Sequence, residues 1–188
     1  MNPIASAIES HQLAVESLKQ QMSEVEACAQ VLTAHLKAGS KILVCGNGGS
    51  AADAQHFAAE LTGRFETQRR ALPAIALTTD TSALTAIGND FGFDEIFSRQ
   101  VEALGNKGDC LVAISTSGNS KNVMQAVSVA KARGLRCIGL LGRDGGALKA
   151  MCDIAVVVNH PQTARIQECH LLIEHIWCAM VDKEFTTE

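Results

Sequence analysis

The sequence is poor in aromatic residues. Its 188 residues include six Phe, one Trp and no Tyr, although apolar residues make up 47% of the chain. Ala, Val, Ile and Leu must therefore build most of the interior, and such side chains suit close packing of helices on a sheet. A chain of this length is one ordinary domain and buries about 70% of the surface of its unfolded state.

The chain also lacks an excess of basic residues and a long apolar run. Its 16 Lys and Arg residues against 20 Asp and Glu residues give a net charge of −4, the wrong sign for neutralising nucleic-acid phosphates. The apolar stretch from Leu171 to Val181 contains Glu174 and His175 and is shorter than the ~20 residues of a membrane span. The first 20 residues do not have the pattern of a secretory signal. The sequence predicts a cytoplasmic protein that binds neither nucleic acid directly nor a membrane.

No C-x-x-C pair occurs among the seven cysteines, which argues against a thiolate zinc site and a dithiol redox site. Cys45, Cys110 and Cys137 lie inside apolar runs. A buried thiol in such a run behaves as a small apolar side chain. We therefore expect reduced, structural cysteines.

Apolar residues recur at steps of three and four from Ile4 to Leu36, as in a heptad-like helix. A helix of this length is about 50 Å long, more than the core of one small domain covers. We therefore expect residues 1–38 to form a helical extension that packs between subunits, with His11 a tolerated polar residue in its apolar stripe. The alternative is an amphipathic helix that lies on its own domain.

The rest of the chain alternates between short aliphatic runs and helical stretches. The runs cover residues 41–45, 73–77, 109–114, 135–141 and 153–158, and the expected helices cover 50–65, 94–104, 119–133, 146–151 and 163–184. Near-continuous aliphatic runs between helices indicate parallel strands that are buried on both faces. The sequence predicts a doubly wound α/β fold with a five-stranded parallel sheet flanked by helices, as a single domain over residues 1–188.

Two loops at the ends of the predicted strands favour phosphate binding. The first strand runs into G-N-G-G-S-A at 46–51, and the third into S-T-S-G-N-S at 115–120. Glycines let the backbone approach a ligand, and the N–H groups at a helix start attract anions. Neither a Walker lysine nor the dinucleotide pattern G-x-G-x-x-G is present, so a small phosphorylated molecule is the better fit. Alternatively, the serine loop caps its helix and the glycine loop is only a turn.

Titratable side chains gather on two of the predicted helices. His56 and Glu60 are four residues apart and share a helix face, where they could hold a metal, exchange a proton or form a surface pair. The terminal helix carries several polar side chains in an apolar segment: Gln167, Glu168, His170, Glu174 and His175. Asn89 and Asp90 follow Gly88 in a short polar segment that we expect to bind sugar hydroxyls or to make a turn.

Five motifs together resemble the phosphoheptose isomerase family of SIS-domain proteins. They are C-G-N-G-G-S-A at 45–51, H-F-A-A-E-L at 56–61, G-N-D-F-G-F at 88–93, S-T-S-G-N-S at 115–120 and R-I-Q-E-x-H at 165–170. The resemblance implies interconversion of sedoheptulose 7-phosphate and D-glycero-D-manno-heptose 7-phosphate through an enediolate, the first step towards ADP-heptose and the lipopolysaccharide core. It also implies a cytoplasmic homotetramer with one zinc ion per subunit.

The resemblance also implies roles for particular residues. The zinc ligands would be His56, Glu60, Gln167 and His175, of which the first three would also contact substrate. The phosphate would be held by Ser115, Thr116, Ser117 and Ser120, and the rest of the sugar by Asn47, Gly48, Gly49, Ser50, Asn89 and Asp90. Glu60 would be the catalytic base and His175 the acid. Ala164 stands where some members have an acidic residue, so no role is carried over to it.

Helix geometry complicates this ligand set. Gln167 and His175 are eight residues apart, about 12 Å along a regular helix and roughly 80° around it. Glu168 shares a face with His175 better than Gln167 does, although the motif favours Gln167. We therefore expect an irregular helix, two side chains that both reach inward, or a site completed by two subunits.

Two other functions compete with the isomerase. A non-enzymatic SIS-domain relative binds phosphosugars and associates with the bacterial replication initiator, but it lacks the residues that match Glu60 and His175. A phosphosugar-sensing regulator would need a DNA-binding segment, which no part of this sequence resembles. Because a binding platform needs no proton-transfer pair, Glu60 and His175 favour the enzyme.

Overall fold

The five predicted strands form one parallel sheet in the computed structural model, which describes residues 2–186. The strands are β1 (Ile42–Cys45), β2 (Ala74–Ala76), β3 (Cys110–Ser115), β4 (Arg136–Gly142) and β5 (Ile154–Val158). Their order in the sheet is β2-β1-β3-β4-β5, with every neighbouring pair parallel. The predicted doubly wound α/β fold is confirmed, and its topology changes direction between β1 and β3, where such folds bind ligands.

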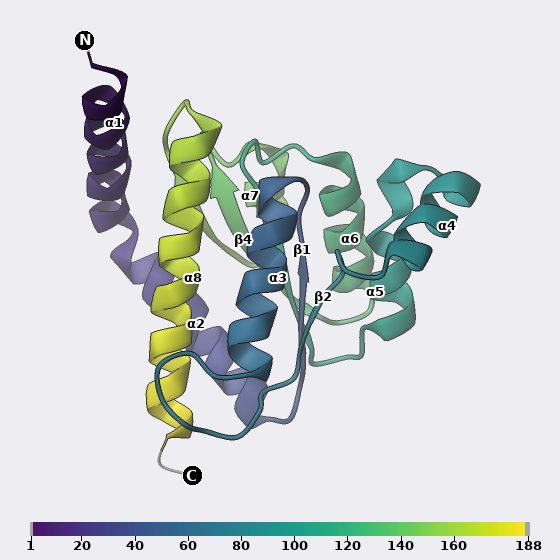
Figure 1. The fold of residues 1–188 in the computed structure, drawn as a ribbon. Coiled ribbons are helices and arrows are strands. Elements are labelled where there is room, and N and C mark those ends of the chain that lie inside the picture. Colours follow the sequence, from purple (N-terminus) through teal and green to yellow (C-terminus); the bar gives the residue numbers. More distant parts are fainter. Residues whose placement is uncertain (1, 187–188) are drawn as a thin grey trace.

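Helices cover both faces of the sheet (Figure 1). They are α1 (Pro3–Leu18), α2 (Met22–Lys37), α3 (Gly49–Thr62), α4 (Thr81–Phe91), α5 (Ser98–Leu104), α6 (Lys121–Ala132), α7 (Gly146–Met151) and α8 (Thr163–Phe185), with short 3-10 helices at Lys19–Gln21 and Phe93–Glu95. The sequence did not predict α4, and the helix expected over 94–104 starts as a 3-10 turn before α5. Helices α2, α3 and α8 share one face of the sheet, while α5, α6 and α7 pack on the other.

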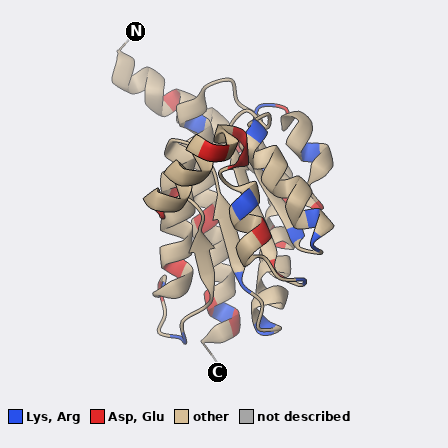
Figure 2. Ribbon diagram, turned by 90° about the vertical axis from the view of Figure 1, so that its right-hand side faces the viewer, with Lys and Arg blue, Asp and Glu red and all other residues tan. Residues whose placement is uncertain are grey.

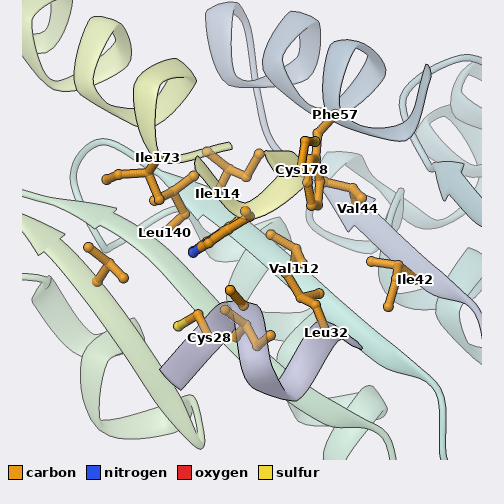
Figure 3. Packing of buried hydrophobic residues seen from close by; sticks show 14 of the residues in the cluster. Cys28, Leu32, Ile42, Val44, Phe57, Val112, Ile114, Leu140, Ile173 and Cys178 are labelled. Atoms are coloured by element: carbon orange, nitrogen blue, oxygen red, sulfur yellow. The ribbon is translucent and has the colours of Figure 1, made fainter. Parts of the chain in front are cut away.

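Alternate residues of each strand feed two separate cores. Ile42, Val44 and Val112 point towards α2, α3 and α8 (Figure 3), whereas Leu43 and Leu111 point to the opposite face. The first core contains the only Trp, whose indole N–H donates to the carbonyl of Val25 at 3.0 Å. This packing fixes α3 and α8 side by side, and they carry most of the candidate catalytic residues.

The predicted long N-terminal helical segment is confirmed and runs from Pro3 to Lys37. A 3-10 turn at Lys19–Gln21 divides it into α1 and α2. Helix α2 lies on its own domain with Leu32 and Leu36 fully buried, as the alternative interpretation expected. Helix α1 extends beyond the sheet (Figure 1) and exposes 69% of Ile4. His11 is not merely tolerated, because its Nδ1 lies 2.7 Å from the Glu168 carboxylate of α8.

The cysteines agree with the expectation of reduced, structural thiols. All seven cysteines are free thiols, and burial raises the pKa of Cys28 and Cys110 to about 12. Figure 2 shows Lys and Arg scattered among Asp and Glu rather than gathered along one helix. Among residues 2–186, no helix combines the length and hydropathy that crossing a membrane requires.

Candidate functional site

The glycine loop after β1 turns sharply into α3. Gly48 has a φ of +58°, a conformation that favours glycine. Gly49 begins the helix, and a Cβ there would lie only 2.2 Å from Nε2 of Gln167. The loop therefore favours glycine at position 48 for its backbone conformation, and a side chain at position 49 would displace the amide of Gln167.

The serine loop after β3 gathers hydroxyl groups. The Ser115 hydroxyl lies 2.9 Å from that of Ser120 and 3.5 Å from that of Ser117, and it accepts from the Gly118 N–H at 3.1 Å. Ser120 occupies the N-cap position of α6, but its side chain makes no capping hydrogen bond. The interpretation of this loop as a simple helix cap therefore fails for Ser120, and its hydroxyl faces the loop interior instead.

The two loops are joined at the sheet edge between β1 and β3. The side-chain amides of Asn47 and Asn122 donate to each other at 2.8 Å in both directions. The pair holds the glycine loop against the first turn of α6, the helix that directly follows the serine loop. Helix starts and hydroxyl groups of this kind suit a phosphate group.

The structure brings His56, Glu60 and His175 together from two helices. The Nε2 atoms of His56 and His175 are 2.8 Å apart, and Oε1 of Glu60 lies 3.4 Å from Nε2 of His56. One donor atom from each of the three residues lies within 4.8 Å of the others. All three side chains are partly exposed, so a ligand can reach them.

This donor set fits zinc. Zinc sites in enzymes combine imidazole nitrogen with carboxylate oxygen and leave a position for water or substrate. The two imidazoles present the same type of nitrogen to each other, and only one of them can donate across the 2.8 Å that separates them. A cation between these nitrogens and the carboxylate would satisfy all three groups.

Helix α8 is one continuous α-helix, so of the three arrangements that we expected the irregular helix is not the one found. Gln167 and His175 instead contact α3 at two levels, because Gln167 lies against Gly49 and His175 against His56. Among the described residues, no hydrogen bond links Gln167 to the His56–Glu60–His175 cluster. Glu168, which helix geometry alone favours, faces away and binds His11 and Arg165 at 2.7 Å and 2.6 Å.

Asn89 and Asp90 do not lie in a polar loop. They occupy the last turn of α4, where the Asn89 amide donates to the Asp90 carboxylate at 2.8 Å. Figure 1 shows α4 at the opposite edge of the molecule from α8. Within one chain, the structure therefore does not bring these two residues to the cluster on α3 and α8.

Two carboxyl groups lie unpaired between α3 and α8. Among residues 2–186, both oxygens of fully buried Glu174 and one oxygen of Asp53 lack a hydrogen-bond partner. Burial raises the pKa of Asp53 to about 6, partly opposed by His56, and burial together with Asp53 raises the pKa of Glu174 well above its usual value. Glu174 directly precedes His175, so the helix carries an unsatisfied acid beside the cluster.

His170, noted from the sequence, belongs to the core. Its Nε2 lies 3.0 Å from the Leu141 carbonyl, and burial lowers its pKa to about 4. Sequence reasoning missed Phe65, whose ring stacks on His175 with centroids 5.3 Å apart and planes 26° from parallel. Nothing in the local pattern around Phe65 signals this contact, because it joins residues 110 positions apart in the chain.

Comparisons with known proteins agree with this geometry. Residues 8–142 match the SIS domain family. A phosphoheptose isomerase from Aliarcobacter butzleri (strain RM4018) is 58% identical over 178 residues, which cover 94% of each protein. Solved phosphoheptose isomerases from Francisella tularensis and Neisseria gonorrhoeae superpose with TM-scores of 0.92 and 0.86, at 42% and 52% identity. The first match covers 96% of both chains, and the second covers 96% of this chain and 95% of the other.

Proposed function

We propose that this chain, which belongs to the SIS domain family and within it to the phosphoheptose isomerases, interconverts sedoheptulose 7-phosphate and D-glycero-D-manno-heptose 7-phosphate. The observation that carries the proposal is the convergence of His56, Glu60 and His175 from α3 and α8. A ketose and its aldose differ by the position of one carbonyl, so their exchange needs a base, an acid and stabilisation of the enediolate between them.

Glu60 is the base in this proposal. Its carboxylate takes a proton from C1 of the ketose and returns it to C2, which moves the carbonyl to C1. His175 supplies and withdraws the protons on the two oxygens, since an imidazole can donate and accept near neutral pH. Because a carboxylate bound to a metal is a poorer base, Glu60 acts while its oxygen is free.

The two loops bind the rest of the substrate. Ser115, Thr116, Ser117 and Ser120 hold the phosphate, while Asn47, Gly48, Gly49 and Ser50 contact the sugar. The support for this assignment is the inward-facing hydroxyl of Ser120 and the positive φ of Gly48. Neutral donors bind the phosphate without the lysine of a nucleotide-binding loop.

One zinc ion per subunit completes the site in this proposal. His56, Glu60 and His175 would hold it, with Gln167 as the fourth ligand carried over from the family motif. A zinc ion at this position supplies a Lewis acid that stabilises negative charge on the sugar oxygens. The support in this chain is the donor set of two imidazoles and one carboxylate.

We also propose a cytoplasmic homo-oligomer, a tetramer as the family resemblance implies. Ile4, Ile8 and Leu13 on α1 are more than half exposed, and Met22, Leu172 and Ile176 line or flank a groove between α2 and α8. A second copy of the chain would cover this apolar surface. Assembly would also let Asn89 and Asp90 of one copy contact the sugar in the site of another.

Incubation of the purified chain with sedoheptulose 7-phosphate, with and without EDTA, tests the substrate and the metal together. We expect an aldoheptose 7-phosphate product that disappears on chelation and returns with added zinc. Glu60→Gln should lower turnover by at least about 100-fold, the usual contribution of a general base. Glu168→Gln is the matched control, because Glu168 binds His11 and Arg165 outside the cluster. A wild-type chain that binds the sugar phosphate but never converts it would instead indicate the non-enzymatic binding platform.

A further inference from the structure

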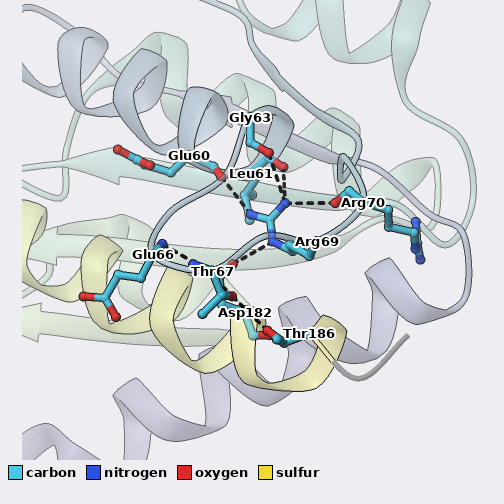
Figure 4. Close-up of polar contacts among 9 residues, drawn as sticks. All are labelled: Glu60, Leu61, Gly63, Glu66, Thr67, Arg69, Arg70, Asp182 and Thr186. Carbon is cyan, nitrogen blue, oxygen red and sulfur yellow. Dashed lines mark hydrogen bonds and ion pairs between the residues drawn. The ribbon is translucent and has the colours of Figure 1, made fainter.

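The loop between α3 and β2, residues 63–73, crosses α8 and is fixed to it at one carboxylate; we call this loop the strap. One oxygen of Asp182 accepts from the backbone N–H of Glu66 at 3.0 Å and of Thr67 at 3.1 Å, and also from the Thr67 hydroxyl at 3.2 Å (Figure 4). Its other oxygen accepts from Nε of Arg69 at 2.6 Å. A single buried side chain on α8 therefore fixes the middle of the strap.

Arg69 ties the same point to the end of α3. Its guanidinium donates to the carbonyls of Glu60 at 2.8 Å and Leu61 at 3.0 Å, which have no partner further along the helix. The Arg69 side chain is fully buried, and its charge is paired with Asp182 while its guanidinium also donates to the carbonyls of Gly63 and Arg70. Glu60, the proposed base, thus has its own backbone carbonyl held by Arg69 of the strap (Figure 4).

The strap places the ring of Phe65 against the imidazole of His175. Phe65 directly precedes the anchored amide of Glu66, and its ring stacks on the imidazole at 5.3 Å. His175 lies seven residues before Asp182, which places both on the same face of α8 about two turns apart. The ring of His56 meets the same imidazole edge-on, with centroids 5.1 Å apart. The imidazole therefore has a flat apolar surface on one side and the cluster at its edge.

We propose that the strap is a positioning device: Phe65 fixes the orientation of the His175 imidazole, and the Arg69–Asp182 pair holds Phe65 in place. This inference rests on the proposed function for its catalytic consequence. Phe65, Arg69 and Asp182 touch neither the reacting atoms nor the phosphate loops in this scheme. They act on His175, and Arg69 acts on the end of the helix that carries Glu60.

The proton NMR signals of the His175 ring test the proposal directly. A stacked phenyl ring shifts the His175 ring protons upfield in the metal-free protein, and their signals are assigned by their loss in His175→Gln. Phe65→Leu should move these signals downfield, Phe65→Tyr should keep them, and Asp182→Asn should move them as Phe65→Leu does. Phe97→Leu is the matched control, because Phe97 is buried in the core on the opposite face of the sheet.

Kinetics then separate positioning from stability. Phe65→Leu should lower kcat about tenfold while KM changes less than about twofold, the size of effect seen when groups behind a reacting residue are lost. Phe65→Tyr should restore kcat, and Phe97→Leu should lower the unfolding midpoint without changing kcat. Unchanged His175 signals in Phe65→Leu, or an unchanged kcat, would overturn the proposal. If the wild-type chain lacked isomerase activity, the proposed function would fail, but the spectra would still decide whether the strap orients His175.

Discussion

Asp182 and Glu174 lie on the same helix, eight residues apart, and both are buried, yet their surroundings are opposite. Asp182 accepts four hydrogen bonds from the strap, whereas neither oxygen of Glu174 has a hydrogen-bond partner in the described part of the chain. Burial alone would raise the pKa of both carboxyls. The hydrogen bonds from Thr67, Arg69 and Glu66 nevertheless hold the pKa of Asp182 below its usual value, while that of Glu174 is raised.

The comparison indicates that the contacts near the C-terminal end of α8 stabilise the fold more than the contacts next to His175 do. Buried polar groups are normally satisfied, and unsatisfied ones concentrate where function requires them. The satisfied acid lies two turns beyond His175 and fixes the strap, while the unsatisfied acid lies directly beside His175. The buried acid two turns after His175 is therefore fully hydrogen-bonded, whereas the buried acid next to His175 is left without hydrogen bonds to its carboxyl group from the residues that the structure describes.

Removing the satisfied acid should have the largest effect. Asp182→Ala leaves the buried guanidinium of Arg69 without its counter-charge and the backbone N–H groups of Glu66 and Thr67 without their acceptor. Breaking a buried ion pair in this way costs about 3–5 kcal/mol of unfolding free energy. Urea titration at pH 7 measures this loss.

The same titration at lower pH checks the cause. The folded protein holds the pKa of Asp182 below the ordinary value, so its contribution is present at neutral pH and is lost as the pH falls through the folded value. The deficit of Asp182→Ala should therefore shrink below about pH 4, near the ordinary pKa of a free Asp. A deficit that stayed constant down to pH 3 would mean that shape, not charge, is what the variant removes.

Removing the unsatisfied acid should have the opposite sign. Glu174→Met replaces an unpaired carboxyl by an apolar side chain of similar length and should raise the unfolding free energy at pH 8 by about 1–3 kcal/mol. Because the folded pKa of Glu174 is raised, the wild-type protein loses stability as the pH climbs from the ordinary value of 4.5 towards the folded one. The advantage of the variant should therefore be larger at pH 8 than at pH 4.

Glu174→Gln separates the charge from the polarity at this position. It removes the titration but keeps a buried polar group, so its advantage over the wild type should lie below that of Glu174→Met at pH 8. If both variants were less stable than the wild type at pH 8, Glu174 would have a partner in solution and the contrast with Asp182 would disappear.

The sequence predicted the sheet well because each parallel strand is buried on both faces and reads as an aliphatic run. It also predicted that His56, Glu60 and His175 meet, since one pair follows from helix spacing and the motifs supplied the third residue. It missed α4, where no residue is fully buried and the last turns contain Gly88, Asn89 and Asp90. These are weak helix formers, so local propensity argued for a turn.

Other features depend on contacts that no local pattern records. The break at Lys19–Gln21 leaves the apolar spacing of the N-terminal segment unchanged, so periodicity could not show it. The contrast between Asp182 and Glu174 is equally invisible in the sequence, because the neighbours of each acid along α8 do not show which groups from elsewhere in the chain will contact it. Only the path of the strap, which depends on how α3 and α8 pack, decides which of them is satisfied.

Removing Glu184, an exposed acid two residues after Asp182 on α8, should have the smallest effect on stability, and it therefore tests the role of burial in the comparison. Glu184 binds Lys37 at 2.6 Å, the same separation as that between Arg69 and Asp182. Unlike Arg69 and Asp182, however, the side chains of Glu184 and Lys37 are both about half exposed. Water and salt screen such a pair, and its formation restricts two long side chains. Glu184→Ala should therefore leave the urea midpoint unchanged within experimental error. A loss of stability comparable to that of Asp182→Ala would show that the distance between the paired groups, rather than their burial, sets how much an ion pair on this helix contributes to stability.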